Sequence, residues 1–225
     1  MQLPDLAWQI VYGRLGWTAV LAALLLALLP RSWRLPRSAA VLVPAACGLL
    51  MALPGKASPA YWLGLALQYP SGLLLGLCLL SLCARWRGAA PRSFMSTPLA
   101  AVLAVAGTAL YLDAIGWLSL GLYHAGFGPT AAPALALLGA AGCALALLRG
   151  HGGREAPALF GAFVLFSLLR LPTGNLWDAV LDPLLWGWAL AALCRRGWRR
   201  AVRAPQRAAL PIEPFSISKE QVRDK

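Results

Sequence analysis

The residues of this chain that could do chemistry are charged side chains within or beside long apolar runs. They are three acids and three bases: Asp113, Asp178, Asp182, Arg14, Lys56 and Arg170. A charge inside a membrane is costly, so such residues are functional candidates by default. Nearly balanced charge at one depth instead predicts pairing, because an unpaired buried charge destabilises a protein. The sequence favours this structural interpretation, in which an ion-pair network locks helices together.

Asp178 and Asp182 are four residues apart and therefore share one helix face. We expect their helix to begin near Asn175. A helix starting at Pro183 would have an apolar length of only roughly 18 Å, too short to cross a bilayer. Asp178 then lies in the first turn, where an acid stabilises the helix N-terminus. Asp182 lies deeper, and there it either pairs with one of the two arginines named above or acts as a functional acid.

A catalytic interpretation combines the same residues into a polar cavity that opens to the outer side. Asp113 or Asp182 would act as a base, and Arg14 and Arg170 would bind an anionic head group. Asp178 is a further candidate for substrate binding. This arrangement requires side chains from distant parts of the chain to converge.

The two histidines give no indication of a metal site. His124 is expected at the outer interface, where it could pair with Asp113 as acid and base, whereas His151 lies in a cytoplasmic link. Because the two histidines lie on opposite sides, they cannot share a metal or a haem. The chain also has no nucleophile elbow of a serine hydrolase and no phosphate-binding loop. We therefore predict no metal and no cofactor.

The composition is that of a polytopic membrane protein. Of the 225 residues, 60% are hydrophobic and only 12% are charged, and the mean hydropathy is +0.66; about a quarter of a soluble domain is charged. The net charge of +12 is spread over short clusters between apolar runs, which argues against nucleic acid as a partner. Arginine outnumbers lysine 17 to 3, a bias typical of GC-rich bacteria. We expect a multi-pass protein of the bacterial inner membrane, with membrane lipids and a membrane protein as partners.

About seven segments are expected to span the membrane, at a rise of about 1.5 Å per residue. Their approximate ranges are 10–29, 38–53, 60–83, 98–123, 130–148, 157–171 and 176–194. Trp8, Tyr12 and Trp17 are expected as interface anchors of the first segment. Pro70 predicts a kink within the third. In an alternative arrangement, residues 112–130 re-enter the membrane or lie at its interface.

The positions of the basic residues predict the orientation. The links 31–37, 85–92, 149–154 and 195–207 contain 3, 3, 2 and 6 Lys or Arg residues, and two spans separate each link from the next. Because positive residues favour the cytoplasmic side, the N-terminus is predicted outside and the C-terminus in the cytoplasm.

The predicted domain organisation is simple. Residues 1–200 form a single transmembrane domain, an all-α polytopic helical bundle, and residues 201–225 form a polar, disordered cytoplasmic tail. The basic segment that follows the last span, which contains Trp198, is expected to lie on anionic lipid head groups.

Three classes of function remain. The small size, the short loops and the lack of a catalytic motif favour a non-catalytic accessory or assembly subunit of a cell-envelope complex. The alternatives are an intramembrane enzyme acting on a lipid-linked substrate at the outer face, and a small transporter. Seven spans without an internal repeat count against transport. Whether the protein is an enzyme stays open at this stage.

Overall fold

The computed structural model describes residues 3–29, 38–89 and 93–208, and within these ranges every regular element is helical. The elements are α1 (Leu6–Leu28), α2 (Ala39–Met51), the 3-10 turn η1 (Gly55–Ala57), α3 (Pro59–Leu67), α4 (Gly72–Trp86), α5 (Thr97–Ala114), α6 (Leu122–Ala125), α7 (Ala131–Leu148), α8 (Glu155–Leu169), α9 (Leu176–Val180) and α10 (Pro183–Ala208). The helices α1, α5 and α7 are long and apolar enough to cross a membrane, and α4 and α8 are shorter apolar helices. The all-α class predicted from the sequence is confirmed for these residues.

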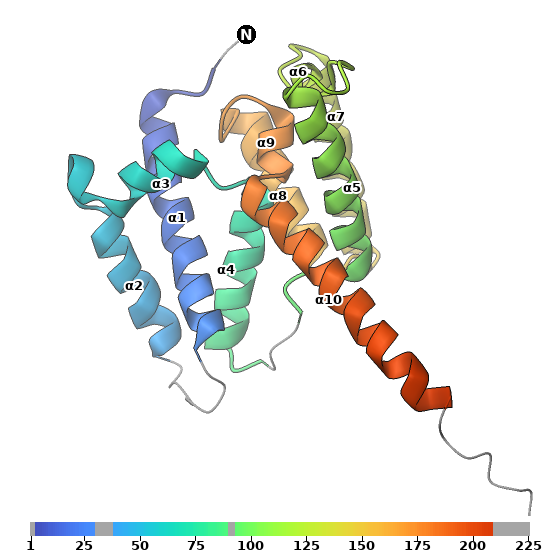
Figure 1. The fold of residues 1–225 in the computed structure, drawn as a ribbon. Coiled ribbons are helices and arrows are strands. Elements are labelled where there is room, and N and C mark those ends of the chain that lie inside the picture. The colour runs from blue at the N-terminus through green and yellow to red at the C-terminus, as the bar shows by residue number, and fades with distance from the viewer. Residues whose placement is uncertain (1–2, 30–37, 90–92, 209–225) are drawn as a thin grey trace, which may run out of the picture.

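The long helices run alternately up and down in Figure 1. The end drawn at the top, called the upper end below, collects residues 52–58, 115–130 and 170–175. The opposite, lower end carries residues 149–154. The helix pairs that pack most extensively are α7 with α8, α4 with α8, α1 with α2, and α5 with α10. The helix α10 continues beyond the lower end of the bundle (Figure 1).

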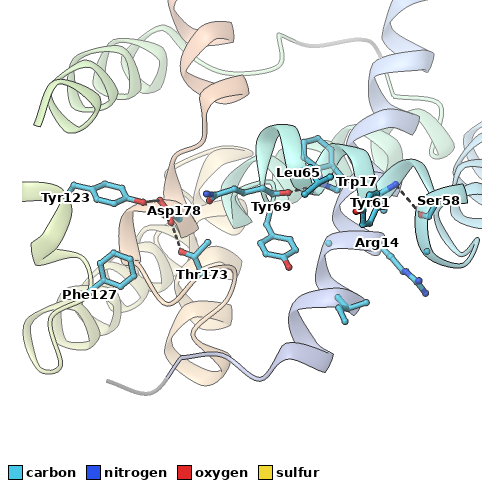
Figure 2. Close-up of a pocket in the computed structure, with 16 residues that line it drawn as sticks. Arg14, Trp17, Ser58, Tyr61, Leu65, Tyr69, Tyr123, Phe127, Thr173 and Asp178 are labelled. Carbon is cyan, nitrogen blue, oxygen red and sulfur yellow. Dashed lines mark hydrogen bonds between the residues drawn. The ribbon is translucent and has the colours of Figure 1, made fainter. Parts of the chain in front are cut away.

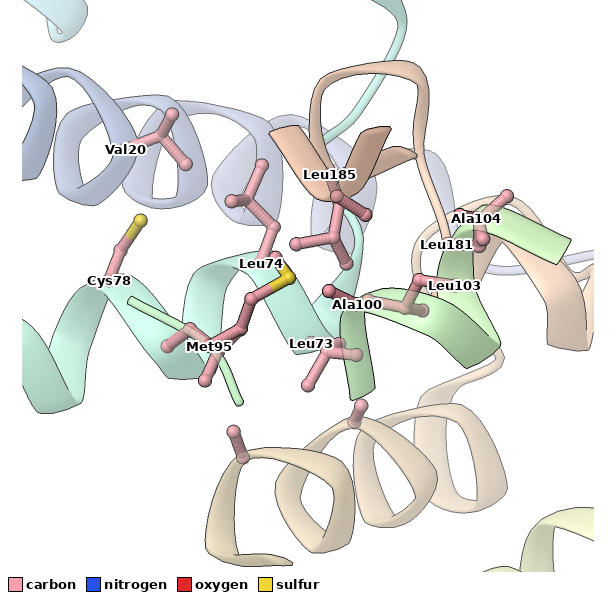
Figure 3. Close-up of a cluster of buried hydrophobic side chains, with 14 of the residues drawn as sticks. Val20, Leu73, Leu74, Cys78, Met95, Ala100, Leu103, Ala104, Leu181 and Leu185 are labelled. Atoms are coloured by element: carbon pink, nitrogen blue, oxygen red, sulfur yellow. The ribbon is translucent and has the colours of Figure 1, made fainter. Parts of the chain in front are cut away.

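The main core lies where α1, α4, α5, α8 and α10 meet. Trp17, Leu73, Leu77 and Leu185 are buried there almost completely. Figure 3 shows Leu73 and Leu185 pointing into this core from different helices. A second cluster, centred on Phe166, joins α7, α8 and α9.

The outer face of α7 is apolar and exposed. Only 11% of the residues of this helix are buried inside the protein. Its exposed side chains include Leu135, Leu137, Leu138, Leu145 and Leu148. An exposed apolar surface of this kind is rare on soluble monomers and fits contact with lipid.

Small residues allow α4 and α8 to approach closely. A Cβ atom on Gly76 would lie 2.9 Å from the Cα and Cβ atoms of Ala158, and one on Gly72 would lie 2.9 Å from the Cβ atom of Ala162. Since the backbone of α8 cannot move away without disturbing the core, both glycines are required by the packing.

The third predicted span is broken into two helices, where the sequence predicted only a kink. Gln68 has φ 59° and ψ −120°, which ends α3. Pro70 has no N–H to continue a helix, and the Ser71 side chain accepts a hydrogen bond from the N–H of Leu74 as the N-cap of α4. The chain therefore restarts in a new direction, and α3 lies across the upper end of the bundle (Figure 1).

The predicted range of the fourth span is too long. The helix α5 ends at Ala114 and does not continue to residue 123. Gly116 has φ 84°. The N–H of Trp117 donates to the carbonyl of Leu112 at 2.8 Å, and the N–H of Gly116 donates to that of Asp113 at 3.0 Å. These two bonds form a Schellman motif, which terminates helices at a glycine. Residues 115–130 consequently form turns and the short helix α6.

The seventh predicted span is also broken. Its helix begins after the N-cap Asn175, as predicted, but α9 ends at Val180 and α10 begins at Pro183. A helix start at Pro183, which the sequence analysis excluded, is present, and α10 continues from there through the basic segment to Ala208. This helix also passes the predicted domain boundary at residue 200. Residues 209–225 of the predicted tail and the basic link 31–37 lie outside the described residues.

We predict that Gly76→Leu destabilises the protein by about 1–3 kcal/mol, because a larger side chain must separate α4 from α8. The matched control is Gly142→Leu in α7, where an added Cβ meets no atom within 4 Å. Thermal unfolding in detergent would measure both variants. Equal unfolding temperatures for the two variants would contradict the close contact between α4 and α8.

Candidate functional site

The buried carboxylate of Asp182 joins the two broken spans. Its Oδ1 accepts a hydrogen bond from the N–H of Leu185 at 2.7 Å, and its Oδ2 accepts one from the N–H of Ser71 at 2.8 Å. The Asp182 residue is only 5% exposed. One side chain therefore caps the start of α10 and also satisfies the backbone just before α4.

Two aromatic side chains of α1 hold the segment between α3 and α4. The hydroxyl of Tyr12 donates to the carbonyl of Pro70 at 2.8 Å, and Nε1 of Trp17 donates to the carbonyl of Gln68 at 3.2 Å. Tyr12 and Trp17 are 6% and 2% exposed. Their prediction as interface anchors was wrong, because the broken helix offers them carbonyl groups inside the protein.

Asp113 performs a similar role at the end of α5. Its Oδ1 accepts hydrogen bonds from the N–H groups of Leu120 at 2.6 Å and Gly121 at 3.0 Å, and its Oδ2 accepts one from Tyr123 at 2.9 Å. The side chain of His124 is exposed and is not among these partners. The sequence-based hypothesis of an acid–base pair between His124 and Asp113 therefore finds no support in this geometry. Asp113 instead fixes the turn that leads into α6.

Asp178 lies half-buried at the upper end, between two hydroxyl groups. The Tyr123 hydroxyl donates to Oδ1 at 3.1 Å, and the Thr173 hydroxyl donates to Oδ2. Burial, and to a smaller extent the Asp178 charge, raise the pKa of the Tyr123 phenol to about 12. The phenol is therefore protonated at physiological pH and donates its hydrogen bond to Asp178.

The sequence indicated only one of the two structural roles of Asn175. Its Oδ1 caps α9 by accepting from the N–H of Trp177 at 2.9 Å, as a cap prediction implies. Its Nδ2 also donates to the carbonyl of Tyr123 at 3.1 Å, and the residue is completely buried. This second bond connects α9 to α6, and no local sequence pattern predicts it.

The predicted ion-pair network is not found among the described residues. All hydrogen-bond partners of the carboxylates of Asp113, Asp178 and Asp182 are backbone N–H groups or hydroxyl groups. The guanidinium of Arg170 lies over the ring of Phe166, 5.1 Å from its centroid. The helix breaks and turns explain the difference, because they expose N–H groups that satisfy a carboxylate without a cation.

A cleft of about 690 Å³ opens at the upper end, between α1, α3, α6 and the segment before α9. Two of the predicted site residues, Arg14 and Asp178, line this cleft, whereas Asp113, Asp182 and Arg170 do not. Other lining residues, several of which are labelled in Figure 2, include Trp17, Ser58, Tyr61, Leu65, Gln68, Tyr69, Tyr123, Phe127 and Thr173. His124 and Lys56 are also absent from the lining. The four residues that the catalytic interpretation combines therefore do not converge in this cleft.

Comparison with protein-family models, with curated proteins and with solved structures found no match to this chain. Among the described residues, no group of three or more His, Cys, Asp and Glu side chains could hold a metal ion. The fold and the site define a helical protein with helices suited to a membrane and a cleft at one end.

We predict that Asp182→Asn destabilises the protein by about 1–3 kcal/mol, because the amide nitrogen that replaces one carboxylate oxygen cannot accept the hydrogen bond of Ser71 or of Leu185. The matched control is Asp5→Asn, since Asp5 caps α1 at an exposed site through one bond to the N–H of Ala7 at 2.7 Å. Asparagine caps a helix as well as aspartate, so this control should change stability by less than about 0.5 kcal/mol. Thermal unfolding in detergent compares the two, and an Asp182→Asn variant as stable as the control would contradict the bridging role.

Proposed function

We propose that this protein is a multi-pass protein of the bacterial inner membrane and a non-catalytic accessory or assembly subunit of a cell-envelope complex. In this proposal it crosses the membrane seven times, with its N-terminus outside and its C-terminus in the cytoplasm. Its partners are membrane lipids and a larger membrane protein.

The hydrogen bonds of the buried acids are the main support for a non-catalytic role. Asp113 and Asp182 bind backbone N–H groups where helices end or begin, with both carboxylate oxygens occupied. A general base must lie within hydrogen-bond reach of the proton that it abstracts, whereas Asp113 and Asp182 are only 9% and 5% exposed. The two strongest candidates for a base thus have structural roles, which supports the accessory function over an enzyme.

The distribution of basic residues supports the proposed orientation. At the lower end, Arg85 donates to the carbonyl of Leu26 at 2.8 Å, and Arg154 donates to the hydroxyl of Ser81 at 2.9 Å. The part of α10 that projects from this end contains further arginines and Trp198, which is 75% exposed. Arginine and tryptophan together are typical of the cytoplasmic interface of a membrane.

We predict that the native protein purifies with a larger membrane partner. The chain would be tagged at its C-terminus, expressed at its natural level, extracted in mild detergent and analysed by native mass spectrometry. The accessory role predicts a stoichiometric complex whose mass clearly exceeds the 23.9 kDa of the chain. A monomer or a homo-oligomer would contradict the accessory role.

A variant of Asp113 tests whether this acid has a structural or a catalytic role. Asp113→Asn would be expressed at the wild-type protein level, with the loss-of-function phenotype of a deletion strain as the reference. The accessory role predicts that function follows the amount of folded protein. Complete loss of function at an undiminished level of folded complex would favour the enzyme alternative.

A further inference from the structure

The exposed face of α10 changes from apolar to basic where this helix passes the lower end of the bundle (Figure 1). Leu184 and Trp188 are 40% and 39% exposed in its first half. Ala191, Arg195 and Arg199 are exposed further along the helix. These five residues follow one another at intervals of three or four and therefore share one helix face, called the α10 strip below.

The side chain of Arg195 has a defined position at the start of the basic part of the strip. Its guanidinium lies over the ring of Trp188, 5.5 Å from the centroid, and its Nε donates to the carbonyl of Ala191 at 3.2 Å. The Trp188 ring packs edge to face against Phe94, with centroids 5.6 Å apart. In the described part of the chain, Nε is the only guanidinium nitrogen of Arg195 that donates a hydrogen bond. Its terminal nitrogens are therefore available to a ligand.

The contacts of Arg196 place this part of α10 at the lower end. The Arg196 guanidinium donates to the hydroxyl of Thr97 and, at 3.4 Å, to the carbonyl of Met95. Thr97 is the first residue of α5, which begins at the lower end. The change from apolar to basic thus coincides with the end of an apolar helix, where an interface between lipid and water is expected.

We propose that the α10 strip binds an anionic phospholipid, with the phosphate at Arg195 and Arg199 and an acyl chain along the apolar part. The planar fork of arginine donors fits a phosphate. Among the described residues, Glu155 is the one acid at the lower end, and its carboxylate accepts from the N–H of Ser96. The basic part of the strip is therefore net positive, and it repels the ammonium group of a zwitterionic lipid. This inference rests on the proposed membrane location but not on the accessory role.

The apolar part of the strip favours a lipid over a soluble anion. A free phosphate or an acidic peptide would occupy the arginines and leave Leu184 and Trp188 exposed, whereas a phospholipid covers both parts. From Leu184 to Arg195 the helix rises at most roughly 17 Å, which is comparable with the roughly 15 Å of hydrocarbon in one leaflet. An added Cβ on the neighbouring Gly187 meets no atom within 4 Å, so an acyl chain has room beside the helix.

The test is native mass spectrometry of the purified full-length protein in detergent, with phosphatidylglycerol and phosphatidylethanolamine titrated separately. We expect phosphatidylglycerol to bind at least about tenfold more tightly, because each arginine near the membrane surface strengthens the binding of an anionic lipid. Two soluble anions, the deacylated head group glycerophosphoglycerol and an oligoglutamate peptide, are titrated in the same way. Both should bind at least about tenfold more weakly than phosphatidylglycerol, because neither has an acyl chain.

A double variant locates the binding. Arg195→Gln with Arg199→Gln removes the partners of the phosphate and should weaken phosphatidylglycerol binding at least about tenfold. Both side chains are exposed, so the fold should be retained. The matched control is Arg87→Gln with Arg149→Gln, which removes the same charge from exposed arginines at the lower ends of α4 and α7. This control should change the affinity by less than about twofold, since it leaves the α10 strip intact.

Three results would overturn the proposal. They are equal affinity for the two phospholipids, an equal loss of affinity in the control variant, and binding of a soluble anion as tight as that of the lipid. Sedimentation of the wild-type protein with the membrane fraction is measured in parallel. Absence from that fraction would refute the proposed membrane location, whereas a membrane-bound protein without the expected selectivity would refute the lipid site alone.

Discussion

The buried carboxylate of Asp182 is the interaction on which the upper half of the molecule depends. A break in an apolar helix leaves N–H groups without partners, and such groups are costly away from water. Asp182 satisfies one N–H on each of two broken segments, at Ser71 and at Leu185. It thereby allows α3 to leave the bundle direction and α10 to restart within the core. The wall that α3 contributes to the cleft follows from this arrangement.

A carboxylate inside an apolar bundle does not require an arginine partner. Asp113 and Asp182 each receive two or more hydrogen bonds from the backbone, and bonds to a charged acceptor are among the stronger ones in proteins. Among the described residues, Arg14 is consequently left without an acid, and Asp178 without a base. Both side chains line the same cleft at the upper end.

The sequence predicted the helical class and the bounds of several helices, because apolar length and proline or glycine signals are local. The bounds of α7 and the N-cap Asn175 were recovered within one or two residues. The partners of the acids were not recovered. The bond between Asp182 and Ser71 joins residues 111 positions apart, and the bond between Tyr12 and Pro70 joins residues 58 apart. No periodicity or composition contains this information, so charge balance alone suggested ion pairs.

Amide hydrogen exchange tests the central role of Asp182 most directly. The N–H groups of Ser71 and Leu185 should be protected in the wild-type protein, and Asp182→Asn should accelerate exchange at both positions together, by roughly tenfold or more. If one carboxylate binds both, these two amides should accelerate together and by more than other buried amides of the same helices. Rapid exchange of the two amides in the wild type, or unchanged protection in the variant, would contradict the bridge between the two broken helices.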